Sequence, residues 1–193
     1  MRRLAGVVLI AAVSACGGGD AEVEDMSDTA PATEAPAPEA EAQIDDADIA
    51  AIVVTANSID VRNGEIARER ASDPRVREFA QTMITDHTAV NQSAQELVTR
   101  LGVTPTENDV SRSLQQSAEE TQQRLSSLSG AEFDRAYMQS EVEYHQAVLS
   151  ALDDTLIPNA TNDELRQTLV SVRPAFQAHL EHAQSLLQEL GGS

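Results

Sequence analysis

The chain has 193 residues, with 13 basic residues against 32 acidic ones and a net charge of −19 at pH 7. A surface this acidic repels phosphate backbones and anionic membrane faces, so we expect no nucleic-acid partner. Aromatic residues make up only 3% of the chain, whereas hydrophobic residues reach 41%. A core built from Ala, Val, Leu and Ile suits packed helices better than a β-sandwich.

The N-terminal residues have the layout of a bacterial secretory signal that ends at a cysteine. A short basic segment precedes an apolar run over residues 4–13. That run is too short to be a permanent membrane span, which is typical of a cleaved signal peptide. The four residues that end at Cys16 read VSAC and resemble a lipobox, in which the cysteine becomes the lipidated first residue. We predict a signal peptide over 1–15 and lipidation of Cys16; the alternative is an ordinary signal peptide and a free thiol.

The segment after the cysteine indicates an anchored protein on a tether. Gly17, in place of Asp, favours the outer membrane by resemblance to enterobacterial sorting rules. Residues 16–43 are acidic and contain almost no large apolar side chains, so we expect a disordered tether that spans roughly 30 Å. We therefore expect a lipid-anchored protein of the cell envelope that faces the periplasm. The membrane is its expected partner through the lipid, and the sequence names no protein partner.

Residues 44–193 form the predicted folded domain, because apolar residues there recur with a helical period. We predict helices over 45–71, 74–101, 107–128, 131–157 and 162–190. Signals for helix ends support these boundaries. They are an N-cap and proline at Asp73-Pro74, a C-terminal glycine at Gly102 and a capping box over residues 129–132.

The lengths of the helices and turns predict how the chain folds up. Four of the helices are each about 40 Å long at 1.5 Å per residue, and the helix over 107–128 is shorter. Short turns make the first and second helices antiparallel, and likewise the last two. If the shorter helix runs back along the outside, the four long helices run up, down, down, up. The expected fold class is all-α: a ferritin-like four-helix bundle with an extra crossover helix.

Helical angles predict a group of polar side chains inside this bundle. Asp60, His87 and His179 lie near the centres of their apolar stripes, and His145 and Glu141 lie one turn apart near the edge of theirs. Their distances from the turns place all five near one level, the bundle midplane. Three imidazoles and one or two carboxylates are a suitable ligand set for one zinc, copper or iron ion. Facing helices of a bundle are where such sites are built.

A buried polar network without metal is the competing interpretation of the same residues. In that network His87 and His145 form hydrogen bonds with Asp60 and with the hydroxyl of Tyr137 or Tyr144. Such a network would also explain polar side chains on the inward faces of helices, because buried polar groups need partners.

Four further positions refine the metal hypothesis. Asp86, beside His87, is a candidate carboxylate partner for an imidazole. Positions 84 and 176 are Ile and Phe, so the paired Glu-x-x-His motif of di-iron carboxylate proteins is absent from the sequence. The fourth histidine, His182, points away from the apolar stripe of its helix. We predict no catalytic residues and no other cofactor.

Several ordered motifs resemble a known family over about residues 46–190. The motifs are Met83-x-x-Asp86-His87, Leu101-Gly102-Val103, Gly130-x-x-Phe133-Asp134-x-Ala136-Tyr137, His145 and Pro174-x4-His179-Leu180. They are similar to the bacterial domain-of-unknown-function 4142 family. The resemblance implies a ferritin-like helical bundle, often secreted or lipid-anchored, without an established activity. It also implies Glu at position 60, an apolar residue at 141 and an acid at 144, where this chain has Asp60, Glu141 and Tyr144.

The expected function is that of a non-enzymatic lipoprotein of the cell envelope. Its buried cluster of histidines and carboxylates would bind one transition-metal ion. The alternatives are a metal-dependent enzyme that uses the site in the bundle, and a purely structural or interaction lipoprotein.

Overall fold

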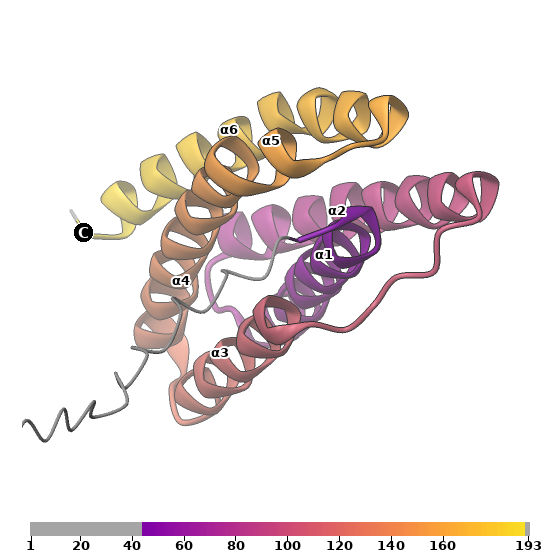
Figure 1. The fold of residues 1–193 in the computed structure, drawn as a ribbon. Coiled ribbons are helices and arrows are strands. Elements are labelled where there is room, and N and C mark those ends of the chain that lie inside the picture. Colours follow the sequence, from indigo (N-terminus) through magenta and orange to yellow (C-terminus); the bar gives the residue numbers. More distant parts are fainter. Residues whose placement is uncertain (1–43, 192–193) are drawn as a thin grey trace, which may run out of the picture. The chain divides into compact units, whose positions relative to one another are not determined.

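The computed structural model describes residues 44–191, in which every regular element is helical (Figure 1). The long helices are α1 (Asp46–Arg70), α2 (Pro74–Leu101), α3 (Asp109–Ser126), α4 (Gly130–Ala151) and α6 (Asp163–Gly191). A π-helical turn, η1 (Leu152–Leu156), and the short α5 (Ile157–Asn159) lie between α4 and α6. The predicted signal peptide over 1–15, Cys16 and the tether up to residue 43 lie outside the described residues. Among the described helices, none combines the length and apolarity of a membrane span.

Capping residues explain where the first helices begin and end. The Asp45 carboxylate accepts hydrogen bonds from the backbone N–H groups of Ala47 and Asp48, both at 2.9 Å. Asp73 caps α2 in the same way, with Pro74 in the first turn, and Gly102 ends α2 in the left-handed conformation at φ 66°. These side chains and the glycine satisfy backbone groups that a helix end leaves without partners. The predicted boundaries at residues 73, 74 and 102 are confirmed.

Two local predictions about α4 are wrong. The side chain of Ser129 forms no capping hydrogen bond, and the following Gly130 adopts a left-handed φ of 59°. At the other end α4 stops at Ala151 instead of continuing as one α-helix to residue 157. Pro158 has no N–H to donate to the carbonyl four residues back. The N–H of Ile157 donates to the Leu152 carbonyl, five residues back, which is the π-helical pattern.

Contacts between helix ends fix the directions of the helices. Arg75 at the start of α2 pairs with Glu189 near the end of α6, at 2.8 Å. Asp46 at the start of α1 accepts hydrogen bonds from the N–H groups of Thr161 and Asn162, just before α6. Hence α1 and α6 run the same way, and α2 runs opposite to both. α1 packs along α2 and α4 along α6, with smaller contacts between α2 and α6 and between α1 and α4. The predicted up-down-down-up bundle is confirmed, with α2 diagonal to α4.

The crossover helix lies on the outside, as predicted. α3 packs against α1 and α4. Asn108, its N-cap, donates to the Asp48 carbonyl at 3.2 Å, and Arg70 at the end of α1 donates to the Leu128 carbonyl at 2.8 Å. α3 therefore runs parallel to α1. Figure 1 shows the extended connection that returns the chain from the end of α2 to the start of α3.

The core of the bundle is apolar at both ends and polar in the middle. Gly64 on α1 brings that helix close to α2: a Cβ at this position would lie 3.0 Å from the Ala80 carbonyl oxygen and 3.0 Å from Ile84 Cγ1. Large buried side chains such as Phe79, Phe133 and Leu169 fill the apolar layers. Between them lies a group of buried polar residues that includes Asn57 and all five predicted site residues. This middle layer is the candidate site.

Candidate metal centre

The five predicted site residues come together from four helices. Asp60 lies on α1, His87 on α2, Glu141 and His145 on α4, and His179 on α6. All five are buried, and His179 is the most exposed at 7%. Nitrogens of the three histidines lie within 4.8 Å of one another, and so do ligand atoms of Asp60, Glu141 and His145. Glu141 was expected at the edge of its stripe, but it is only 1% exposed.

The three imidazoles, which we call the histidine triad, form a nearly equilateral triangle. The ring centroids of His87 and His145 are 5.6 Å apart, those of His87 and His179 are 5.3 Å apart, and those of His145 and His179 are 5.5 Å apart. A circle through three centroids at these spacings has a radius of about 3.2 Å. An ion bound to an imidazole lies at a similar distance from the ring centroid, because the metal–nitrogen bond is about 2.1 Å and the nitrogen is about 1.1 Å from the centroid. One ion at the centre therefore has the right distance to all three rings.

His87 is oriented by a neighbour on α1. Its Nδ1 lies 2.8 Å from Asn57 Oδ1, and Asn57 Nδ2 donates to the Val53 carbonyl at 2.8 Å. Because the amide N–H₂ of Asn57 is used there, its oxygen faces the imidazole, and Nδ1 of His87 carries the proton. The other nitrogen, Nε2, then holds a lone pair. Phe176 stacks on the ring, with centroids 5.0 Å apart and planes 15° apart.

The other two imidazoles are held in the same manner by different acceptors. His145 Nδ1 donates to the backbone carbonyl of Glu141, one turn earlier, at 3.0 Å. His179 Nε2 donates to the carboxylate of Asp86 at 2.9 Å, so Asp86 orients His179 and not its neighbour His87. Across the described residues, the nitrogens left over at His87, His145 and His179 are buried and have no hydrogen-bond partner. Each ring is thus anchored through one nitrogen and has the other free.

Asp60 faces two of these free nitrogens. Its Oδ2 lies 3.3 Å from His87 Nε2 and 3.8 Å from His145 Nε2. When the carboxyl is ionised, all three atoms are hydrogen-bond acceptors, so lone pairs oppose one another unless a proton or a cation lies between them. The electron pairs of the cluster converge on a shared space.

Burial sets the ionisation of these groups. It lowers the pKa of His87 from 6.5 to about 2, an effect increased by His145 and His179, and lowers the pKa of His145 to about 4. It raises the pKa of Asp60 from 3.8 to about 7, and it holds the pKa of Glu141 well above its ordinary value, together with the nearby Asp60. Near neutral pH, His87 and His145 are therefore uncharged, which is the form that binds metals.

The structure lacks the bonds from tyrosine to histidine in the predicted metal-free network, but it places Asp60 beside His87 and His145 as that network expects. The Tyr144 hydroxyl donates to the Ala56 carbonyl at 2.9 Å, and the buried Tyr137 hydroxyl faces the Glu141 carboxyl. Neither hydroxyl serves a histidine. A proton on Asp60 could satisfy one imidazole nitrogen at a time, and the Glu141 carboxyl interacts with Asp60. Within residues 44–191, the free nitrogens of His87, His145 and His179 have no hydrogen-bond partner.

Sequence reasoning missed one residue of the site and correctly left out another. Asn57 precedes Asp60 by three residues and so lies on the same helix face, which is the signal that could have identified it. Asn57 is buried in the structure. His182 lies outside the cluster with an exposed side chain and contacts the edge of Phe79.

Comparisons with known proteins bear on the family and the fold. A family model described as a domain of unknown function, DUF4142, matches residues 30–186. Among curated proteins, none matches the chain. A crystal structure of a DUF305 protein from Streptomyces coelicolor, described as secreted, is similar with a TM-score of 0.64. The match covers 75% of this chain and 94% of that chain at 16% identity, so it supports the helical fold alone.

Proposed function

We propose that this chain, which belongs to the DUF4142 family, binds a single transition-metal ion at the histidine triad His87, His145 and His179. The observation that carries the proposal is the arrangement of the ring nitrogens. Each imidazole is anchored through one nitrogen by a carbonyl, amide or carboxylate oxygen, and its second nitrogen is buried without a partner. Metal-binding histidines are held in this way, because the anchor fixes both the tautomer and the orientation of the ring.

The remaining ligands follow from the distances to the triad. Asp60 supplies a carboxylate next to His87 and His145, and Glu141 offers a second one close to Asp60. Three nitrogens and one oxygen suit zinc, copper or iron, with metal–ligand bonds of about 2.0–2.2 Å. Binding a dication would also offset the cost of an ionised Asp60 in a buried position.

The closed surroundings favour a role in holding the ion over a role in catalysis. Catalytic metal sites keep a coordination position open to substrate. Here Asp60, His87 and His145 are at most 2% exposed, and His179 only 7%. Storage, buffering or stabilisation by the metal fits this burial better than hydrolysis of a dissolved substrate.

Metal titration of the tag-free chain tests the proposal. We expect zinc, copper or iron to bind with one ion per chain in calorimetry and to raise the melting temperature, since a ligand of the folded state stabilises it by mass action. His87→Ala, His145→Ala and His179→Ala should each weaken binding by at least about 100-fold. His182→Ala is the matched control, because that histidine is exposed and outside the cluster, and it should bind like the wild type.

Two results would overturn the metal site. One is a melting temperature that neither the three metals nor a chelator changes in the wild-type chain. The other is a loss of binding in His182→Ala as large as the loss in the triad variants.

We further propose that the chain is a lipoprotein of the cell envelope, anchored through Cys16 and facing the periplasm from the outer membrane. The basic segment, the short apolar run and the VSAC sequence support the anchor. The description of the similar DUF305 protein as secreted is consistent with export.

A further inference from the structure

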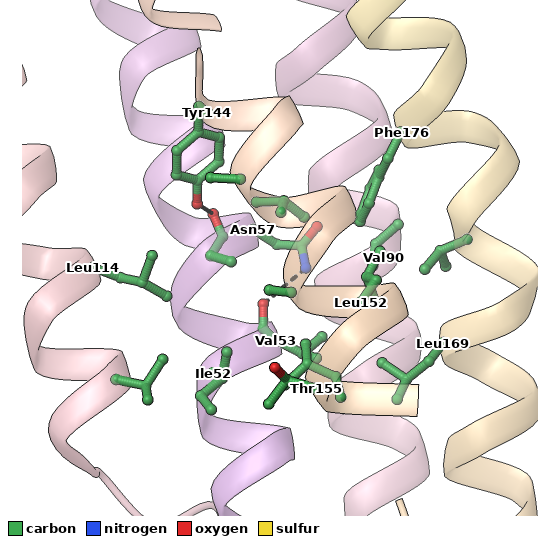
Figure 2. A pocket seen from close by; sticks show the side chains of 17 residues that line it. Ile52, Val53, Asn57, Val90, Leu114, Tyr144, Leu152, Thr155, Leu169 and Phe176 are labelled. Atoms are coloured by element: carbon green, nitrogen blue, oxygen red, sulfur yellow. Dashed lines mark hydrogen bonds between the residues drawn. The ribbon is translucent and has the colours of Figure 1, made fainter. Parts of the chain in front are cut away.

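Phe176 and Asn57, which contact the His87 ring of the histidine triad, also line a cavity of about 220 Å³ (Figure 2). Its wall comes from α1, α2, α3, α4, η1 and α6. Figure 2 shows Leu169 and Phe176 of α6 on one side, with Leu114 of α3 and Ile52 of α1 on the other. It is therefore a space between all the long helices and not a groove on one of them.

The lining predicts the chemistry of an occupant. None of the residues of the wall carries a charged side chain. Its two main polar groups are already used: Asn57 Nδ2 donates to the Val53 carbonyl, and the Tyr144 hydroxyl donates to the Ala56 carbonyl. An ionic ligand would find no counter-charge here. Apolar cavities of roughly 150 Å³ stay dry and accept a guest of the size of benzene.

The π-helical turn shapes one side of the cavity. Leu152, Thr155 and Leu156 of η1 belong to the wall. The turn is fastened to α6 by Asp153, whose two carboxylate oxygens each accept a hydrogen bond from Arg173 at 2.7 Å. Such turns are rare within α-helices and are found frequently at functional sites. The cavity thus depends on a specific and fixed departure from α-helical geometry.

The two ends of the cavity differ in their surroundings. Val110 of α3, which is 45% exposed, and the exposed Ala147 of α4 belong to its lining and mark the way to solvent. At the inner side lie Phe176 and Asn57, which respectively stack on the His87 ring and accept its Nδ1 proton. A guest would therefore contact the residues that orient one imidazole of the triad.

We propose that this cavity is a binding site for an uncharged, apolar small molecule of about the size of one aromatic ring. The guest passes between Val110 and Ala147 and packs against Phe176. The site needs no metal for its formation, so it stands or falls separately from the metal centre.

Benzene and two six-carbon probes test the proposal on the full chain, kept metal-free with a chelator. Benzene should give saturable changes in the NMR methyl signals of Val90, Val148 and Leu169 and in the ring signals of His87. Hexan-1-ol should bind at least about tenfold more tightly than hexanoate at pH 8, because the wall offers the carboxylate no positively charged partner.

A filling variant and a matched control locate the site. Ala151→Leu places extra carbon atoms in the cavity and should weaken benzene binding by at least about tenfold. Ala136→Leu makes the same change on the same helix outside the cavity and should leave the affinity unchanged. Where Ala151→Leu does not fold, Ala56→Leu fills the cavity from α1 and makes the same test.

Three outcomes would overturn the proposal. They are unchanged methyl signals up to the solubility limit of benzene, full affinity in the folded filling variant, and hexanoate binding as tightly as hexan-1-ol.

Discussion

Asp60 carries a carboxyl group into a buried position, so its ionisation contributes to how the stability of the metal-free protein depends on pH. Burial raises its pKa from 3.8 to about 7. A group whose pKa is higher in the folded state gives stability that is present below pH 3.8 and is lost as the pH rises through 7.

We therefore predict that the free energy of unfolding of Asp60→Asn, relative to that of the wild type, is higher at pH 8 than at pH 5. The difference in the free energy of unfolding should change by more than about 1 kcal/mol between the two pH values. Urea denaturation in the presence of chelator measures it. The buried histidines also contribute to the free energy of unfolding, and this contribution is lost as the pH falls below 6.5. It is largely the same in both proteins and cancels in the comparison. A difference that stays constant from pH 5 to pH 8 would contradict this assignment.

Asn57 is a positioning residue, because it touches the back of His87 and not the space inside the triad. Asn57→Ala removes the acceptor at 2.8 Å from His87 Nδ1 and should weaken metal binding by about 10–100-fold. Asn57→Asp keeps an acceptor oxygen and should recover most of the affinity. Asn91→Ala, at a residue that donates to Ser58 Oγ, is the control in the same calorimetric titration. Equal affinities for Asn57→Ala and the wild type would exclude this role.

The sequence predicted which side chains point inward but not which atoms they contact. Helical angle and distance from the turns were enough to identify Asp60, His87, His145 and His179. The pairing of His179 with Asp86 depends on rotamers across two helices, which no periodicity encodes. Glu141 was misplaced because its exposure was judged from its own helix, whereas Asp60 of the neighbouring α1 also lies close to it.

Among the helices, the contact of α1 with α2 has the tightest point, at Gly64. A methyl group there would lie 3.0 Å from the Ala80 carbonyl oxygen, which belongs to a helix backbone and cannot rotate away. We predict that Gly64→Ala lowers the free energy of unfolding by about 1–3 kcal/mol, in spite of the better helix propensity of alanine. Thermal and urea denaturation measure the change.

Gly191→Ala is the control for this substitution. Nothing lies within 4 Å of a Cβ at Gly191, so that variant should stay within about 0.5 kcal/mol of the wild type. A Gly64→Ala protein as stable as the wild type would show that α2 moves away without cost.

Helix boundaries were predictable wherever a single residue determines them. Asp73, Pro74 and Gly102 act through their own dihedral angles and hydrogen bonds, so the sequence pattern was sufficient. The π turn was not predictable, because Pro158 permits either an early end to the helix or a shifted register. The contact of Asp153 with Arg173 on α6 holds the shifted one.

At the scale of the whole molecule, the order of the helices follows from the lengths of their connections. Turns of a few residues at 71–73 and 160–162 force antiparallel neighbours, and the outside path of α3 makes α2 and α4 parallel. The cavity had no such signal. It arises where small and apolar side chains from six elements fail to fill the same volume.

The proposed membrane anchor concerns the whole chain, and a single substitution tests it. Cys16→Ala should abolish lipidation and release the protein in soluble form, because the lipid on Cys16 is the proposed attachment to the membrane. Labelling with a radioactive fatty acid and fractionation of the cells measure both effects. Membrane retention of the variant, with unchanged labelling, would refute the lipoprotein assignment.

The triad draws its three imidazoles from α2, α4 and α6, and Asp60 comes from α1. Only Glu141 and His145 are close along the chain, so no short segment of the unfolded polypeptide holds three residues of the proposed metal site. Ion capture at that proposed site would therefore follow the docking of the helices. A chain that folds only after export can then take its metal only from the compartment where it folds. The composition of that metal pool, more than intrinsic affinity, would select which ion the protein carries.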